Sequence, residues 1–172
     1  MLLIFSGLPG TGKSALARAV SERIGAVWLR VDTLEASMLK AGLARSFETG
    51  LAAYLGVEDI AEEELRLGHT VVVDAVNGVE EGRQMWRQLA ARTQVPRFVV
   101  EVFISDTIEH RRRVESRTAP TPPLPKPTWD EVITREYLPW NEPVLAVDGV
   151  QPIDVNVPKI LSYCRTPPSP AR

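Results

Sequence analysis

Residues 7–14 read GLPGTGKS and match the pattern G-x-x-x-x-G-K-[ST] in full. In this pattern the glycines let the backbone curve until successive amide groups point at one anion. Lys13 can reach the terminal phosphates of a nucleotide, and the hydroxyl of Ser14 is a suitable ligand for Mg²⁺. We therefore expect a triphosphate to bind the loop through Gly10, Thr11, Gly12, Lys13, Ser14 and Ala15.

The segments on either side of this loop are those that a phosphate site requires. Residues 2–5 form a short apolar run, typical of a buried parallel strand. Residues 15–24 carry Leu16, Val20 and Ile24 on one helical face and end at Gly25, a plausible helix C-cap. Because a helix N-terminus offers unpaired N–H groups and the positive end of its dipole, this order favours anion binding over an ordinary glycine turn.

The composition is that of one globular domain. The chain has 172 residues, 44% of them hydrophobic and 24% charged, and its net charge of -2 argues against a broad electrostatic contact with nucleic acid. A single cysteine, Cys164, excludes an internal disulfide and a cysteine-based zinc site, and favours a reducing, cytoplasmic setting. No apolar run has the length of a membrane span.

His69 and His110 are isolated, so we expect both to be structural or surface residues.

Apolar and amphipathic segments alternate along the chain. The predicted strands are 2–5, 27–31, 70–73, 98–104 and 144–147, and the predicted helices are 15–24, 34–43, 47–67 with a possible break at Gly56, 80–93, about 106–117, 129–138 and 157–164. Strands separated by helices predict an α/β fold, a five-stranded parallel sheet with helices on both faces. We expect one domain over 1–165, with a lid at about 113–128, and a flexible tail over 166–172.

Carboxylates follow two of the predicted strands, at the sheet edge where such folds bind ligands. Asp32 follows the second strand, where it could accept the proton of an attacking hydroxyl, and its alternative role is the N-cap of the next helix. Asp74 ends the run 71–73 and could hold Mg²⁺ through water, bind the acceptor, or simply form a turn. Asn77, three residues after Asp74, would lie at the edge of the same ligand site.

The predicted helix at about 106–117 is rich in arginine. Arg113 and Arg117 are four residues apart and share a helical face, and a proline-rich stretch at 119–127 follows them. We interpret this region as one side of a lid whose arginines close on phosphate oxygens. The alternative is a solvated face held by the pairs Glu109–Arg113 and Arg111–Glu115.

Four segments resemble the small P-loop kinases related to chloramphenicol phosphotransferase, zeta toxin, gluconate kinase and the kinase domain of phage polynucleotide kinase. They are GLPGTGKS at 7–14, RVD at 30–32, VVVDAVN at 71–77 and RRRVESR at 111–117, in the same order along nearly the whole chain. Residues 127–140 also resemble uncharacterised bacterial ATP-binding members. The resemblance implies a P-loop NTPase three-layer sandwich that uses ATP and Mg²⁺ to phosphorylate a hydroxyl of a small molecule or a polynucleotide end.

The resemblance also implies roles for single residues. By position, Asp32 matches the family's base, Arg113 and Arg117 its lid pair, Asp74 and Asn77 its acceptor-side loop, and Arg83 a helix arginine of some members. Together with the roles argued above from the residues, the expected catalytic residues are Lys13, Asp32, Arg113 and Arg117, and the expected metal ligands are Ser14 and, through water, Asp74. The expected contacts of the acceptor are Asp32, Glu35, Asp74, Asn77 and Arg83. One position departs from phage polynucleotide kinase: Glu35 stands where that enzyme carries an arginine that helps to hold an anionic acceptor. A carboxylate there would repel an anion, so we expect a neutral or cationic metabolite or antibiotic.

Other nucleotide-binding classes fit less well. No N-K-x-D-like guanine motif is present, and the chain is too short for an AAA+ or transport motor. Three alternatives remain: a polynucleotide-end kinase, a nucleotide-binding regulatory protein with weak ATPase activity, and a nucleoside monophosphate kinase with a partial acceptor pocket near Arg45, Arg83 and Arg135. A small-molecule acceptor is the expected partner, a nucleic acid or membrane partner is not expected, and no motif sets an oligomeric state.

Overall fold

A five-stranded parallel sheet is the centre of the fold, in a computed structural model that describes residues 1–116 and 123–165. Its order is β2-β3-β1-β4-β5, and every neighbouring pair is parallel. The strands are β1 (Leu2–Ser6), β2 (Val27–Arg30), β3 (Val71–Asp74), β4 (Arg97–Phe103) and β5 (Leu145–Asp148). The predicted α/β fold is confirmed.

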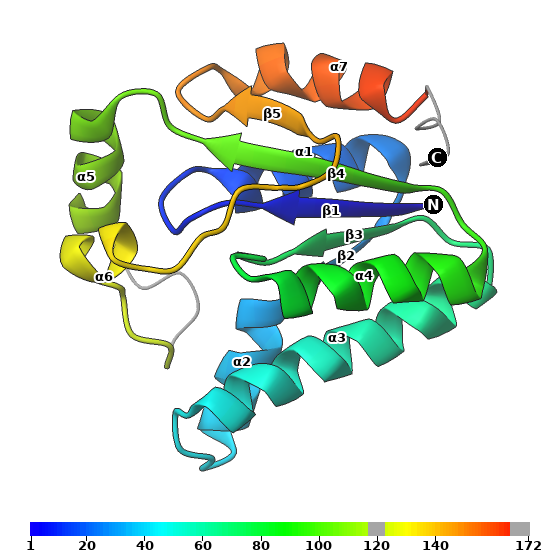
Figure 1. Ribbon diagram of the computed structural model, residues 1–172, viewed down its shortest axis with the longest axis horizontal. Helices are drawn as coiled ribbons and strands as arrows, with labels where there is room; N and C mark the ends of the chain where they lie inside the picture. Colours follow the sequence, from blue (N-terminus) through cyan, green and yellow to red (C-terminus); the bar gives the residue numbers. More distant parts are fainter. Residues whose placement is uncertain (117–122, 166–172) are drawn as a thin grey trace.

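Helices cover both faces of the sheet (Figure 1). They are α1 (Lys13–Ile24), α2 (Val31–Lys40), α3 (Phe47–Arg66), α4 (Glu80–Thr93), α5 (Thr107–Ser116), α6 (Trp129–Ile133) and α7 (Ile153–Tyr163). Helices α1 and α7 pack on one face, and α3 and α4 pack on the other, which makes the predicted three-layer sandwich. No helix within residues 1–116 or 123–165 has the length and hydropathy of a membrane span.

The central strand β1 divides its side chains between the two layers. Leu2 and Ile4 belong to the core beneath α3 and α4, whereas Leu3 and Phe5 belong to the core beneath α1 and α7. Successive side chains of a strand point to opposite faces, so a strand covered on both sides must be apolar throughout. This strand delivers the chain to the glycine-rich loop at its carboxyl end.

Helix α2 begins earlier than predicted, directly after β2. Its N-cap is Arg30, whose side chain makes no capping hydrogen bond, and Asp32 lies in the first turn. The alternative role of Asp32 as an N-cap is therefore wrong. An acid in the first turn still interacts favourably with the helix dipole.

Helix α3 is continuous through Gly56, where the sequence suggested a break. A Cβ atom at this position would lie 2.7 Å from Cδ2 of Leu34 in α2. The glycine thus permits close approach of α2 and α3, which is a packing requirement and not a helix end.

Helix α6 is shorter than the predicted 129–138. Its start is correct, because Thr128 forms a capping box with Glu131, but the helix ends at Ile133. The chain then passes the loop between β3 and α4, where the N–H of Leu138 donates to the backbone oxygen of Gly78 at 2.8 Å.

Arg83 fixes this segment. The side chain is 1% exposed, and its guanidinium donates to the backbone oxygens of Asn77, Leu138 and Pro139 at 2.9, 2.6 and 2.8 Å. It also lies 4.0 Å from the ring centroid of Trp140. Because all three guanidinium nitrogens donate to backbone oxygens inside the fold, we withdraw the prediction that Arg83 contacts an acceptor.

We expect Arg83→Leu to lower the free energy of unfolding by about 2–4 kcal/mol, since partly buried carbonyl oxygens lose their donors. Urea unfolding followed by circular dichroism measures this change. The matched control is Arg18→Leu on α1, whose exposed side chain pairs with Glu22 and should contribute less than about 1 kcal/mol. Equal unfolding midpoints for the two variants would contradict the role assigned to Arg83.

Candidate active site

The glycine-rich loop joins β1 to α1 and needs glycine at three positions. Gly7 has a φ of 144°, and a Cβ atom there would lie 2.3 Å from the backbone oxygen of Val102. Gly10 and Gly12 have φ values of 88° and 93°, in the left-handed region that side chains disfavour. Gly12 is the N-cap of α1, and its carbonyl accepts from the amides of Ala15 and Leu16 at 3.1 and 3.2 Å. The loop therefore opens at a helix N-terminus, where amide groups are available for an anion.

A cavity of about 180 Å³ lies at this helix N-terminus. It is lined by Gly10, Gly12, Lys13, Ser14, Ala15 and Arg113. The remaining predicted loop residue, Thr11, turns inward: it is 2% exposed, and its hydroxyl donates to the backbone oxygen of Leu8 at 2.9 Å. The structure thus gathers five of the predicted loop residues and Arg113 around one space.

Arg113 reaches this cavity from α5 and is held in place from two sides. Its Nε donates to Glu109 at 2.7 Å, and its Nη1 donates to the backbone oxygen of Gly149 at 2.8 Å. Hydrogen bonds from Arg112 and Arg113 lower the pKa of Glu109 to about 2. The Glu109–Arg113 pair of the alternative interpretation therefore exists, and it orients Arg113 toward the loop. The expected partner of Arg113, Arg117, lies outside the described residues.

His110, which sequence reasoning treated as structural or surface, supports the loop directly. Its Nε2 donates to the backbone oxygen of Pro9 at 2.8 Å, and its ring packs edge-on against Trp129 at 5.2 Å between centroids. A Cβ atom at Gly10 would lie 3.2 Å from the His110 ring and 2.6 Å from Val114. Helix α5 thus packs against the loop so closely that only glycine fits at position 10.

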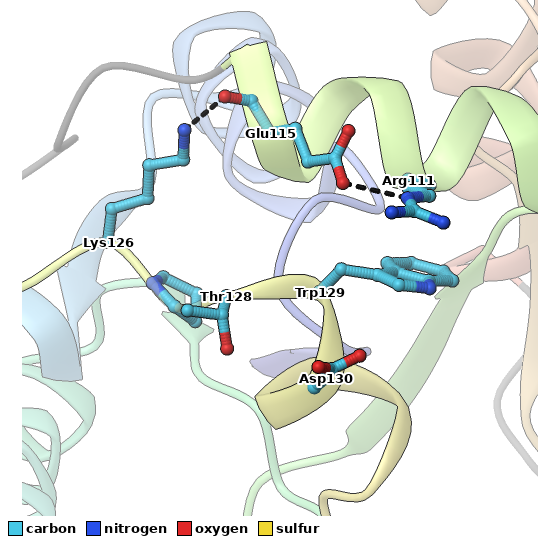
Figure 2. A pocket seen from close by; sticks show the side chains of 7 residues that line it. Arg111, Glu115, Lys126, Thr128, Trp129 and Asp130 are labelled. Atoms are coloured by element: carbon cyan, nitrogen blue, oxygen red, sulfur yellow. Dashed lines mark hydrogen bonds and ion pairs between the residues drawn. The ribbon is translucent and has the colours of Figure 1, made fainter.

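The described part of the predicted lid is anchored to the same helix. Figure 2 shows Arg111 paired with Glu115, at 2.7 Å, and Lys126 in contact with the backbone oxygen of Glu115. A separate cavity of about 430 Å³ lies between α5 and the start of α6, and Trp129 lines it. Lys126 and Trp129 therefore tie residues 123–128 to α5, the helix that carries Arg113.

A buried cluster of charges lies beneath the loop. Lys13 and Asp74 are 7% and 3% exposed, and Nζ of Lys13 lies 3.9 Å from Oδ1 of Asp74. On the other side, Nε of Arg30 lies 3.3 Å from Oδ2 of Asp74. Sequence reasoning missed Arg30, although it is part of the RVD segment at 30–32. One carboxylate thus faces two cations, and Lys13 retains positive charge for a phosphate.

The residues present fit a nucleotide with Mg²⁺. Oδ2 of Asp74 is buried without a hydrogen-bond partner, so it could accept from a metal-bound water. Residues 1–116 and 123–165 contain no cluster of three metal-binding side chains, but Mg²⁺ normally uses one or two protein ligands besides phosphates and water. The hydroxyl of Ser14, with Asp74 through water, would hold the ion, which would offset charge on the phosphates.

A second cavity, of about 160 Å³, adjoins the loop on the side of α2. Its polar lining consists of Lys13, Asp32, Glu35, Arg45 and Arg135, and Pro125 and Pro127 also line it. Burial, and secondarily the charge of Asp32, raises the pKa of Glu35. Lys13 is the side chain that the two cavities share.

Asn77 does not join this second cavity. It is 1% exposed, its Nδ2 donates to the backbone oxygen of Phe5 at 3.1 Å, and its Oδ1 accepts from Nε1 of Trp86 at 2.8 Å. The side chain holds the loop after β3 in a left-handed turn, with φ 52°. We therefore correct its predicted role: Asn77 shapes the edge of the site from inside the core.

A family model described as "AAA domain" matches residues 2–136. The chain belongs to this family. The description names a domain and not an activity, so the exclusion of an AAA+ motor stays a prediction. An uncharacterised protein of Mycobacterium tuberculosis, Rv2004c, is 32% identical in a 119-residue alignment that covers 63% of this chain. The matched region is 24% of that protein, so the chain corresponds to about a quarter of its relative's length.

Solved structures of kinases have a fold similar to that of this chain. The APS kinase CysC of Mycobacterium tuberculosis, in complex with AMPPNP and APS, has a TM-score of 0.72 at 22% identity, covering 96% of this chain and 97% of that one. A gluconokinase of Sinorhizobium meliloti has a TM-score of 0.70 at 19% identity, covering 95% and 90%. At these identities the likeness establishes a P-loop kinase-like fold.

His110 gives a prediction for nucleotide binding. We expect His110→Ala to weaken binding of a non-hydrolysable ATP analogue with Mg²⁺ about fivefold, because the loop loses one buried hydrogen bond. His110→Gln, which keeps an N–H donor, should restore part of the affinity, and the exposed His69→Ala is the control. Calorimetric titration measures all three, and an affinity for His110→Ala equal to that of the control would contradict the role.

Proposed function

We propose that the protein is an ATP-dependent kinase that transfers the γ-phosphate to a hydroxyl of a small molecule. The observation that carries the proposal is the position of Lys13, which lines both the cavity at the N-terminus of α1 and the adjoining cavity that contains Asp32. A triphosphate bound to the loop would end between the two cavities. An acceptor beside Asp32 would then meet the terminal phosphate.

The residues divide between two tasks. The amides of residues 10–15, Lys13 and Arg113 bind and neutralise the phosphates, and Asp32 orients the acceptor hydroxyl. In the transfer, the acceptor oxygen bonds to the γ-phosphorus, the bond from that phosphorus to the bridging oxygen of ADP breaks, and the hydroxyl proton passes to Asp32. Leu124, Pro125 and Pro127 line the acceptor cavity, and their segment would exclude water, which otherwise competes with the acceptor.

The size of the second cavity favours a small acceptor. At about 160 Å³ and beneath prolines, it suits a metabolite better than a polynucleotide end. The kinase activity of solved structures with this fold agrees with this choice.

Asp32→Asn tests the proposed base. We expect turnover of an acceptor to fall about 10²–10⁴-fold while the affinity for the ATP analogue stays within about twofold, since the amide cannot accept the proton. Asp59→Asn, on the exposed side of α3, is the matched control. The measurement is ADP release across a panel of hydroxyl compounds, and undiminished turnover in Asp32→Asn would remove Asp32 from catalysis.

Lys13→Ala tests the phosphate site. We expect it to abolish transfer, because Lys13 supplies the central positive charge for the terminal phosphates. ADP release measured with and without acceptors separates a kinase from a weak ATPase. ATP hydrolysis by the unaltered protein that no acceptor accelerates would favour the regulatory alternative.

A further inference from the structure

Two arginines from separate segments line the acceptor cavity. Arg45 lies in the connection between α2 and α3, and Arg135 lies just after α6. Most arginines of the described residues pair with a carboxylate, as Arg92 does with Glu58 and Glu62 at 2.7 and 2.6 Å. Within residues 1–116 and 123–165, neither Arg45 nor Arg135 forms a salt bridge with a carboxylate.

The carboxylates near Arg45 and Arg135 either have other roles or are too few to neutralise both arginines. Glu131 accepts from the N–H of Thr128 at 2.7 Å and caps α6. Glu35 is close enough to both arginines that their charges counteract the burial that raises its pKa. Asp32 lies in the same cavity and is assigned to the reacting hydroxyl. Hydrogen bonds from Thr128, and secondarily the charges of Arg45 and Arg135, lower the pKa of Glu131, so this carboxylate also lies near both arginines. Among the residues that line the cavity, Glu35 is the one carboxylate left beside the two guanidinium groups.

We propose that the acceptor is a small hydroxylated acid, whose anionic group binds Arg45 and Arg135 while another hydroxyl or an amino group donates to Glu35. This inference rests on the kinase proposed above. Guanidinium groups present paired N–H donors that match the oxygens of a carboxylate, sulfate or phosphate. The acceptor would thus extend from Asp32, at the phosphate, toward the two arginines.

This proposal replaces the expectation of a neutral or cationic acceptor. That expectation rested on Glu35 alone, at the position where phage polynucleotide kinase carries an arginine. In the folded chain, the cavity that contains Glu35 is lined by three cationic side chains, Lys13, Arg45 and Arg135, and by two carboxylates, Asp32 and Glu35. Positive charge for an anion thus comes from two other segments.

An anion titration that needs no turnover tests the proposal. The ¹⁵N-labelled protein, saturated with Mg²⁺ and a non-hydrolysable ATP analogue, is titrated with sodium sulfate, sodium acetate or sodium chloride at constant ionic strength. We expect sulfate or acetate, but not chloride, to shift the side-chain Nε–Hε signals of Arg45 and Arg135 saturably. The more effective anion indicates whether the acceptor carries a carboxylate or a sulfate-like or phosphate-like group.

The same titration of substituted proteins tests whether the anion binds in this cavity. Arg45→Gln and Arg135→Gln should each weaken the fitted affinity about tenfold, because a charge-assisted hydrogen bond is lost. Glu35→Gln should strengthen it, and Arg18→Gln, far along α1, should leave it unchanged. Unshifted signals, or full affinity in both arginine variants, would overturn the proposal.

A turnover assay compares acids with their alcohols, glycerate with glycerol and gluconate with glucitol. We expect the acid of a pair to be phosphorylated at least about tenfold faster, with the preference lost in Arg45→Gln. A faster alcohol would overturn the proposal. If the ATP analogue does not bind, the kinase assignment fails, whereas the anion titration, repeated without nucleotide, still decides whether Arg45 and Arg135 form an anion site.

Discussion

The site depends on how the positive charge of Lys13 is balanced beneath the glycine-rich loop. A buried ammonium group is costly unless a carboxylate faces it, and Asp74 supplies that carboxylate. The sheet order explains why Asp74 is there. Strand β3 lies between β1 and β2, so Asp74 is in register with both Phe5, just before the loop, and Arg30, just before α2. Strand pairing thus assembles the charge cluster from three distant segments.

Arg30 adds a second positive charge beside Asp74, so the charges of this buried cluster do not cancel. If Asp74 faced Lys13 alone, the pair would be neutral and would attract a phosphate less strongly. With a second cation 3.3 Å from the same carboxylate, the cluster carries net positive charge at the junction of the two cavities. The proposed kinase therefore draws its electrostatic attraction for the terminal phosphate from β2 and β3 as well as from the loop.

Much of this arrangement was predictable from the sequence, because it depends on residues that are close together along the chain. The glycine-rich motif, the apolar run of β1 and the alternation of strands and helices depend on near neighbours along the chain. Arg83 and Asn77 were misassigned because their partners are distant: Arg83 binds residues 138 and 139, and Asn77 binds Phe5. The charge of the acceptor was predicted from Glu35 alone, and Arg45 and Arg135 were named only as a partial pocket for a nucleoside monophosphate. The fold places all three side chains in one cavity. The support of the loop by His110 likewise depends on contacts across about one hundred residues.

The turn after β5 lies directly against the loop. A Cβ atom at Gly149 would lie 1.9 Å from the backbone oxygen of Thr11, and the carbonyl of Gly149 holds Arg113. The loop is thus enclosed by a segment that the ribosome makes well after the loop itself. At about 5–20 residues per second, the ribosome completes this enclosure on the order of ten seconds after it makes the loop. A nascent chain therefore acquires its complete phosphate site only after β5 has been made, so nucleotide capture depends on a segment far downstream of the loop.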